Sequence, residues 1–526
     1  MIINFLIIIQ VQMSFSTILS AVIEGLEVAF IHVEADISNG LPVFHMVGYL
    51  SSEVKEAGER VRTAIKNSGF EYPAKRTVVN LSPATMRKHG ASFDLPIAAA
   101  ILTALGQIEK PEKDCLIIGE LSLGGSVKKV SGVLPIVMEA KEKGVRKCIV
   151  PSENVTEASL VSEMEIVGAA TLQEAVEAMQ NRRKRKKIQN KEITDCGNLR
   201  KTVQKETKFP DFADMKGQEF VKRAAEIAVA GGHNLLLIGP PGSGKSMTAK
   251  CIAGILPPLD LRESLEITKI YSVLGLVDEK TPLIVDRPFR EVHHTATKAA
   301  LIGGGTIPHP GEISLAHKGV LFLDELPEFR RDTLEVLRQP LEERYVNLSR
   351  TYGNYTFPAN FMLVAAMNPC PCGCFPNANC TCTPLQIQAY QNRISRPFLD
   401  RIDLCVEASQ VKYEHLSDEQ KGESSKEIRK RICRVREMQR IRYKETGNLT
   451  NAMLEGDALN KYCKLGTKEK KVMEQAFSVM NLTARGYSRI LKTARTIADL
   501  EESDAIKVKH LQEALGYRMD NRKYTV

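Results

Sequence analysis

Short apolar runs and stretches with helical periodicity alternate along most of the chain. Near-continuous apolar runs, which are typical of strands buried on both faces of a parallel sheet, precede Gly239 and occupy residues 319–325 and 361–368. Strand-like and helical patterns alternate in the first third, at residues 26–35, 51–67, 77–81, 95–105 and 134–143. Helical patterns follow residue 411. We therefore predict an α/β protein with an N-terminal α/β domain, a central parallel-sheet domain and a C-terminal helical lid.

A glycine-rich loop follows the first of these apolar runs. Residues 234–246 read NLLLIGPPGSGKS, and the helix-compatible sequence MTAKCIAGIL comes next. Glycines let backbone N–H groups close around phosphates, the lysine reaches the β- and γ-phosphates, and the final serine holds Mg²⁺. The pattern predicts a site for a nucleoside triphosphate. Its expected ATP-binding residues are Gly239, Pro240, Pro241, Gly242, Ser243, Gly244, Lys245 and Ser246.

The two later apolar runs end in polar residues suited to phosphate chemistry. GVLFLDE ends in Asp324 and Glu325, and FMLVAAMN ends in Asn368. Ligands of parallel sheets gather at the carboxyl ends of the strands, so these residues should meet at the phosphate loop. We predict that Asp324 holds Mg²⁺ together with Ser246 and that Glu325 polarises the attacking water. Asn368 is expected to orient that water or the γ-phosphate.

The residues between the phosphate loop and residue 358 contain two further patterns. Residues 290–319 are rich in glycine, proline and histidine, but the histidines are irregularly spaced, so we expect a flexible functional loop rather than a metal site. Residues 332–343 read as a helix, and residues 344–358 predict a β-hairpin. Arg350 near its tip is a candidate contact for a DNA phosphate, with a solvent-facing arginine as the alternative.

Five of the twelve cysteines lie within residues 370–382. Cys370 with Cys372, and Cys380 with Cys382, form two C-x-C pairs separated by a Pro/Asn turn. Four soft ligands at close range suit tetrahedral Zn²⁺, and we expect structural zinc there rather than free or redox-active thiols. Cys374 is a spare ligand in the same segment.

Composition and charge place the chain among globular proteins with one basic segment. Of 526 residues, 43% are hydrophobic and 26% charged, which predicts a cytoplasmic protein without membrane contact. The apolar residues 1–12 are too few to span a bilayer, and we expect Met13 to be the true start. Much of the net charge of +9 comes from the run at 182–187. That segment predicts a basic linker, either solvated or in contact with nucleic acid.

The resulting domain boundaries are an apolar extension at 1–13, an α/β domain at 14–178, a basic linker at 179–209, a nucleotide-binding domain at 210–410 and a helical lid at 411–526. The first domain resembles the proteolytic domain of Lon proteases in GASFDLPIAAAIL and GELSLGGSVKKVSGVLPI. Against that pattern Ser92 falls at or near the nucleophile, but Leu134 occupies the position of the lysine base. Because leucine cannot take a proton from serine, we expect no peptidase activity and a scaffold for assembly or DNA contact.

The second domain resembles AAA+ ATPases. By similarity to minichromosome-maintenance and magnesium-chelatase ATPases, Arg401 in NRISRPFLDRIDL matches the arginine finger that faces a neighbouring subunit's γ-phosphate, with Arg396 as the second choice. In the lid sequence LTARGYSRILKTARTIADLE, Arg485 matches the sensor-2 arginine that touches the nucleotide, and Arg489 is its substitute. The resemblance also places the segment around Gly217–Gln218 near the adenine.

Taken together, the segments are similar to the ComM/YifB family of magnesium-chelatase-like AAA+ ATPases over nearly all of residues 14–520. The sequences PGEISLAH and NPCPCG are specific to this resemblance. It implies a homo-hexamer that uses ATP and Mg²⁺ to drive a motor on single-stranded or branched DNA, a branch-migration helicase of recombination or natural transformation. None of the DNA activity follows from spacing or composition.

Three other functions remain open. A magnesium-chelatase ATPase that drives metal insertion or protein remodelling would share the core, but the fused Lon-like domain is not expected there. A Lon-like ATP-dependent protease is disfavoured by Leu134. A non-enzymatic scaffold is disfavoured by Lys245, Asp324, Glu325 and Asn368 as a set.

Overall fold

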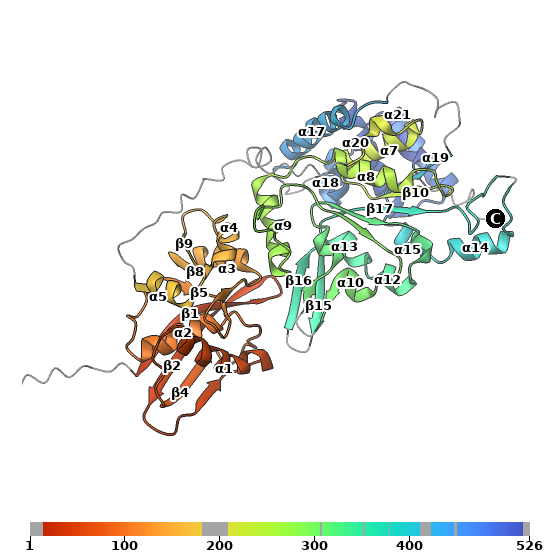
Figure 1. Ribbon diagram of the computed structural model, residues 1–526. Helices are drawn as coiled ribbons and strands as arrows, with labels where there is room; N and C mark the ends of the chain where they lie inside the picture. Colours follow the sequence, from red (N-terminus) through yellow and green to blue (C-terminus); the bar gives the residue numbers. More distant parts are fainter. Residues whose placement is uncertain are drawn as a thin grey trace, which may run out of the picture. The chain divides into compact units, whose positions relative to one another are not determined.

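The computed structural model describes residues 14–180, 209–305, 308–350, 353–377, 379–410, 422–445 and 450–518. The extension 1–13 and the basic run at 182–187 lie outside these residues. Two compact units make up the chain (Figure 1). The first comprises the described parts of Met1–Val203, Leu261–Val285 and Ile307–His309, and the second those of Gln204–Asp260, Asp286–Thr306 and Pro310–Val526.

A seven-stranded mixed sheet lies at the centre of the first unit, in the order β3-β4-β2-β1-β5-β8-β9. Its strands are β1 (Phe15–Glu24), β2 (Glu27–Ser38), β3 (Phe44–Val47), β4 (Arg76–Ser82), β5 (Cys115–Ile117), β8 (Lys147–Pro151) and β9 (Glu165–Ala169). The strands β1, β2 and β4 pair antiparallel, and the other pairings are parallel. A small ribbon of β6 (Glu120–Leu121) and β7 (Val127–Lys128) lies outside this sheet.

The helices of the first unit are α1 (Ser52–Asn67), α2 (Asp94–Ala104), α3 (Val133–Glu142), α4 (Val155–Ala158), α5 (Leu172–Gln180) and α9 (Leu261–Val273). Helix α2 is buried along its whole length, and its alanines allow close packing on β1 and β2. Its buried Asp94 accepts a hydrogen bond from Arg60 Nε at 2.9 Å, which compensates the buried charge. Helix α9 follows the phosphate-loop helix in sequence, yet it packs on α3 in this unit.

The second unit is built on a five-stranded parallel sheet in the order β11-β14-β17-β10-β18. The strands are β10 (Leu235–Ile238), β11 (Phe289–Val292), β14 (Val320–Leu323), β17 (Met362–Met367) and β18 (Leu404–Glu407). The antiparallel pair β15 (Tyr345–Arg350) and β16 (Gly353–Pro358) confirms the predicted β-hairpin. The helices around the sheet are α7 (Glu219–Gly231), α8 (Lys245–Ile255), α10 (Lys298–Ile302), α11 (Glu312–Leu315), α12 (Arg331–Glu335), α13 (Arg338–Glu343), α14 (Pro384–Gln391) and α15 (Arg396–Leu399).

The C-terminal region is helical, as predicted, with α17 (Ser425–Arg442), α18 (Gly456–Tyr462), α19 (Thr467–Met480), α20 (Ala484–Leu500) and α21 (Val508–Gly516). Helices α17 and α20 pack on α7 (Figure 1). One face of α20 buries Ile490, Ala494 and Ile497 in a core that continues into α7 and the sheet. The 3-10 turn η4 (Asn451–Met453) also packs on α20.

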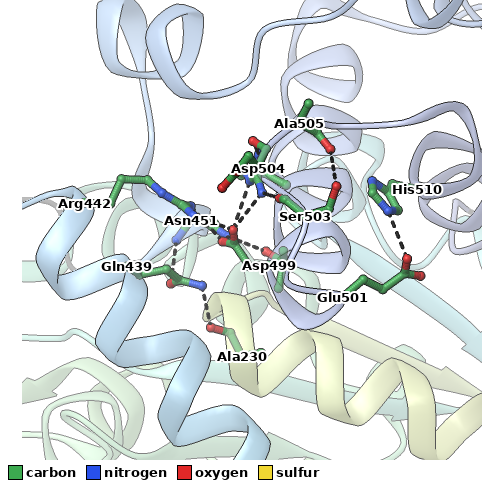
Figure 2. Close-up of polar contacts among 12 residues, drawn as sticks. Ala230, Gln439, Arg442, Asn451, Asp499, Glu501, Ser503, Asp504, Ala505 and His510 are labelled. Atoms are coloured by element: carbon green, nitrogen blue, oxygen red, sulfur yellow. Dashed lines mark hydrogen bonds and ion pairs between the residues drawn. The ribbon is translucent and has the colours of Figure 1, made fainter.

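A buried polar network fastens the lid helices together (Figure 2). The carboxylate of Asp499 accepts hydrogen bonds from Arg442 Nη2 at 2.7 Å and from Asn451 Nδ2 at 2.8 Å. Gln439 Nε2 donates to the carbonyl of Ala230 at the end of α7, at 3.1 Å. The network therefore joins α17, η4 and α20 to the helix that precedes β10.

The structure differs in detail from two expectations about elements. Residues 332–343 form two short helices, α12 and α13, rather than one. Pro340 explains the break, because proline fits the first turn of a helix but not its interior. Residues 290–319 are not simply a flexible loop: they contain part of β11, then α10 and α11. Among the described residues no helix is both long and apolar enough to cross a membrane.

Candidate nucleotide-binding site

The phosphate loop connects β10 to α8, and three of its glycines are required by its geometry. Gly242 and Gly244 have φ of 75° and 81°, in the left-handed region that favours glycine. Gly239 lies so close to β18 that a Cβ atom there would stand 2.2 Å from the carbonyl oxygen of Ala408. The loop therefore keeps its tight backbone only with these residues, and helix α8 begins directly after it at Lys245.

Lys245 is held inside this loop. Its Nζ donates to the carbonyl oxygens of Gly239 and Pro240, each at 2.8 Å, and to Asn368 Oδ1 at 3.2 Å. Burial lowers the pKa of the Lys245 ammonium, an effect opposed by the charges of Asp324 and Glu325. Lys245 and Asn368, both predicted to contact the terminal phosphates, are thus hydrogen-bonded to each other. They come from different parts of the sheet, because Lys245 follows the loop after β10 and Asn368 follows β17.

Ser246 and Asp324 also meet, as the strand pattern predicts. Ser246 Oγ donates to Asp324 Oδ2 at 2.8 Å. A hydroxyl and a carboxylate side by side match the oxygen ligands that Mg²⁺ prefers. The donor set fits a magnesium ion, which when bound supplies positive charge against the β- and γ-phosphates.

Glu325 lies at the same edge of the sheet, in an unusual backbone conformation. Its φ is 51°, and its side chain is 56% exposed. Its Oε2 atom stands 3.1 Å from Nδ1 of His294, the second residue after β11. Sequence reasoning missed this partner. The position of His294 just after a strand could have indicated it, but the two charged residues of β11 hide the strand pattern in the sequence.

Gln218 links the phosphate loop to the end of β18. Its Nε2 donates to the carbonyl oxygens of Ser243 and Ser409, both at 2.8 Å. It occupies the turn before α7 with φ of 57°. The segment predicted to lie near the adenine therefore contacts the phosphate loop.

The predicted arginines gather at the opposite edge of the sheet. Arg401, Arg485 and Arg489 line a cavity of about 530 Å³ together with Asn234, the residue before β10. The phosphate loop lies at the other end of β10, and four strand residues span about 13 Å. The structure thus does not bring these arginines to the phosphate loop of the same chain.

The carboxylate of Glu342 holds two of these arginines. Arg401 is 5% exposed and its Nη2 lies 2.8 Å from Glu342 Oε1, whereas Arg485 is 58% exposed and lies 3.3 Å from the same oxygen. Arg489 donates to the carbonyl of Ile402 at 2.9 Å. Arg396, the second choice for the finger, is exposed at the start of α15.

The four cysteines of the two C-x-C pairs come together. The Sγ atoms of Cys370, Cys372, Cys380 and Cys382 all lie within 4.8 Å of one another. The backbone N–H groups of Cys374 and Thr381 lower the pKa of the Cys372 thiol to about 5. Among the described residues, no other cluster of three or more cysteine, histidine or acidic side chains is placed to hold a metal. Four cysteines suit zinc.

Ser92 and Leu134 have separate surroundings in the first unit. Ser92 lines a cavity of about 240 Å³ with His89, Glu120 and Lys129. Leu134 lies in the first turn of α3 and is fully buried in an apolar cluster. Arg350, the candidate DNA contact, is exposed at the end of β15.

Comparison with known proteins places this arrangement in a class. The family model "Magnesium chelatase, subunit ChlI" matches residues 211–416, "Subunit ChlI of Mg-chelatase" matches residues 33–154, and "Magnesium chelatase, subunit ChlI C-terminal" matches residues 422–518. The parallel sheet and these matches define a magnesium-chelatase-like AAA ATPase, a domain type that implies ATP hydrolysis.

Full-length relatives then identify the family. The chain is 44% identical over 503 residues to the uncharacterized protein YifB of Salmonella typhimurium, covering 95% of this chain and 96% of that one. It is 42% identical over 514 residues to the competence protein ComM of Haemophilus influenzae, covering 96% and 98%. The chain belongs to the ComM/YifB family. A weaker similarity links it to Lon protease 2 of Bacillus subtilis, 31% identity over 128 residues, or 24% and 23% of the two chains.

Proposed function

We propose that this chain is an ATP-hydrolysing ring motor that remodels branched DNA during recombination or natural transformation. The proposal rests on one observation: the predicted catalytic groups lie at opposite ends of the strands of one sheet, which we call its carboxyl edge and its amino edge. Lys245, Ser246, Asp324, Glu325 and Asn368 lie at the carboxyl edge, and the arginine group of Arg401, Arg485 and Arg489 lies at the amino edge. A complete site therefore needs two chains.

Hydrolysis of ATP follows from the groups at the carboxyl edge. The loop N–H groups and Lys245 bind the phosphates, and Ser246 with Asp324 holds Mg²⁺. Glu325 accepts a proton from the attacking water, while Asn368 holds the γ-phosphate or that water in line. The pairing of Glu325 with His294 supports this role, because it fixes the direction of an otherwise exposed carboxylate.

A neighbouring copy supplies the arginines. In a head-to-tail ring, the amino edge of one protomer's sheet faces the phosphate loop of the next. Arg485 is more exposed than Arg401 and lies farther from Glu342, and a guanidinium at the γ-phosphate stabilises the charge that develops there. Arg401 reaches the same place only after it leaves Glu342.

Three features support DNA as the substrate. The chain is similar over nearly its whole length to a protein named for competence. The hairpin of β15 and β16 carries the exposed Arg350 as the last residue of β15, where it is available to a phosphate backbone. The basic run at 182–187 adds positive charge in sequence before the ATPase domain.

The test is ATP hydrolysis by the full chain with candidate effectors. We expect stimulation by single-stranded DNA and by a four-way junction, and none by a porphyrin or by casein. Stimulation by the porphyrin alone would favour a magnesium-chelatase activity, and stimulation by casein a protein-remodelling activity. Hydrolysis near zero under all conditions would contradict the motor altogether.

A further inference from the structure

Four thiol groups converge immediately after the strand that carries Asn368. Cys370 follows Asn368 and Pro369, and its Sγ lies 3.4 Å from that of Cys372 and 3.7 Å from that of Cys380. The Sγ atoms of Cys372 and Cys380 are 3.6 Å apart. In a tetrahedral ZnS₄ centre with Zn–S bonds of about 2.3 Å, neighbouring sulfurs are about 3.8 Å apart. The thiols are therefore spaced for one shared ion.

The surrounding backbone supports the same centre. The N–H of Phe375 donates to Cys370 Sγ at 3.3 Å and so helps to orient this sulfur. Gly373 turns the chain between the ligands with φ of 80°. The fifth cysteine of the segment, Cys374, lies outside the group of four: its Sγ donates to the carbonyl of Cys372.

The cysteine segment and the end of β17 just before it contact the nucleotide site at three points in all. A Cβ atom on Gly373 would stand 2.4 Å from Cδ of Pro241, in the phosphate loop. Two residues before Cys370, Asn368 accepts from Lys245, and the carbonyl of Met367 accepts from the N–H of Gly239 at 3.1 Å. A displacement of the cysteine segment therefore moves groups that contact the phosphate loop directly.

We propose that Cys370, Cys372, Cys380 and Cys382 bind one Zn²⁺ and that this ion clamps the segment bearing Asn368 against Pro241, so that ATP binding depends on the metal. The proposal rests on the nucleotide site of the proposed function but on none of its DNA chemistry. Without the ion, the four sulfurs are no longer joined and the segment loses its cross-link. Asn368 and Pro241 then lose their common support.

The first experiment measures zinc in the purified full chain by mass spectrometry of the elements. We expect about one zinc per chain, its loss in Cys372→Ser and Cys380→Ser, and its retention in the matched control Cys374→Ser. A native chain without zinc after growth in zinc-supplemented medium overturns the proposal. Equal loss from the Cys374→Ser control overturns the assignment of the four ligands.

The second experiment tests the clamp on native protein, which avoids variants that fail to fold. Zinc is removed with a nitrogen chelator that leaves Mg²⁺ in place, and the affinity for a fluorescent ATP analogue is measured without DNA. We expect a loss of about tenfold or more that added Zn²⁺ reverses. Unchanged affinity overturns the clamp. Failure of DNA to stimulate hydrolysis has no bearing on this readout, so the two proposals fail separately.

The third experiment changes the contact and leaves the thiols intact. Gly373→Ala should keep its zinc and lose about tenfold in ATP affinity, because the new Cβ pushes Pro241 away. Gly69→Ala is the matched control, because Gly69 in the first unit has the same φ of 80° but nothing within 4 Å of the added Cβ. Unchanged ATP affinity in Gly373→Ala contradicts the proposed contact.

Discussion

Glu325 combines an exposed carboxylate with a backbone conformation that glutamate rarely adopts. A non-glycine residue in the left-handed region costs about 1 kcal/mol or more, and such residues cluster at functional sites. The conformation turns Glu325 out of β14 towards His294, while Asp324 faces Ser246. One strand end thus delivers two carboxylates to two different partners.

This division predicts the result of Glu325→Gln. The variant should bind ATP as tightly as the native chain, because Lys245 and Asp324 remain, but its turnover should fall by about 100-fold or more without the base. Equilibrium binding of an ATP analogue and steady-state phosphate release measure the two quantities. The matched control is Glu328→Gln, an exposed carboxylate paired with Arg393 in the same connection. Normal hydrolysis by Glu325→Gln would show that another group is the base.

His233 predicts a pH dependence of stability in the second unit. Burial lowers the pKa of this imidazole to about 4, and its Nε2 hydrogen-bonds Thr496 of α20 at 2.8 Å. The unfolded chain takes up the proton near pH 6.5, so it binds more protons than the folded chain between pH 6.5 and 4. The contribution is full above pH 6.5 and falls by about 3 kcal/mol as the pH drops to 4.

Chemical denaturation at pH 7 and pH 4 measures this contribution. In His233→Gln the free energy of unfolding should change less between the two pH values than in the native chain. His32→Gln, at an exposed position on β2, is the control and should keep the native dependence. Equal pH dependence in His233→Gln and the native chain would refute the assignment.

At the level of residues, the sequence predicted those site residues whose position is set by the carboxyl end of one strand. Asp324 and Asn368 directly follow apolar runs, Lys245 and Ser246 follow another one after the glycine-rich loop, and parallel strands bring their ends together. Pairings across the fold were not predictable, because neither periodicity nor motif relates Glu342 to Arg401 or His294 to Glu325. Those pairings depend on side-chain directions that only the packed structure determines.

At the level of elements, the lid is fastened by charge as well as by its apolar face. Asp499 is 1% exposed, and Arg442, Arg495 and Asn451 all donate to it. These donors come from α17, α20 and η4, so one carboxylate joins three elements (Figure 2). Burial of such a group is tolerated only while its partners remain.

Asp499→Asn should therefore destabilise the second unit by about 3–5 kcal/mol, because two arginines lose their counter-charge in a buried setting. Thermal and urea unfolding of the full chain measure the change. Glu437→Gln removes an exposed carboxylate paired with Arg440 on α17 and should leave the midpoint where it is. Equal midpoints for Asp499→Asn and the native chain would mean that the apolar face of α20 alone holds the lid.

Elements with continuous apolar runs or clear helical periodicity were predicted well, and β11 and α9 show where this fails. Strand β11 reads FREV and lies at the sheet edge, so its two charged residues break the apolar run. Helix α9 lies within the ATPase sequence but packs in the first unit, which no local pattern can indicate. Whether a strand lies at the edge of a sheet, and in which unit a helix packs, is determined by the whole fold.

At the level of the whole molecule, the separation of the phosphate loop from the arginine group has a consequence that a single chain cannot test. If the arginines act on a neighbour, then Lys245→Ala and Arg485→Ala damage opposite sides of one shared site. Each protein alone should hydrolyse little ATP. A ring that contains both has some interfaces where an intact phosphate loop faces an intact Arg485.

Mixing the two inactive variants should therefore restore activity. In a random equal mixture, about a quarter of the interfaces of a closed ring pair an intact loop with an intact arginine, so hydrolysis should recover to about a quarter of the native rate. Phosphate release against mixing ratio should peak near equal amounts. The control mixes Lys245→Ala with Glu325→Gln, which both damage the carboxyl edge and cannot complement each other. No recovery in the first mixture would mean that Arg485 acts within its own chain or not at all, and the division of the site between protomers would be wrong.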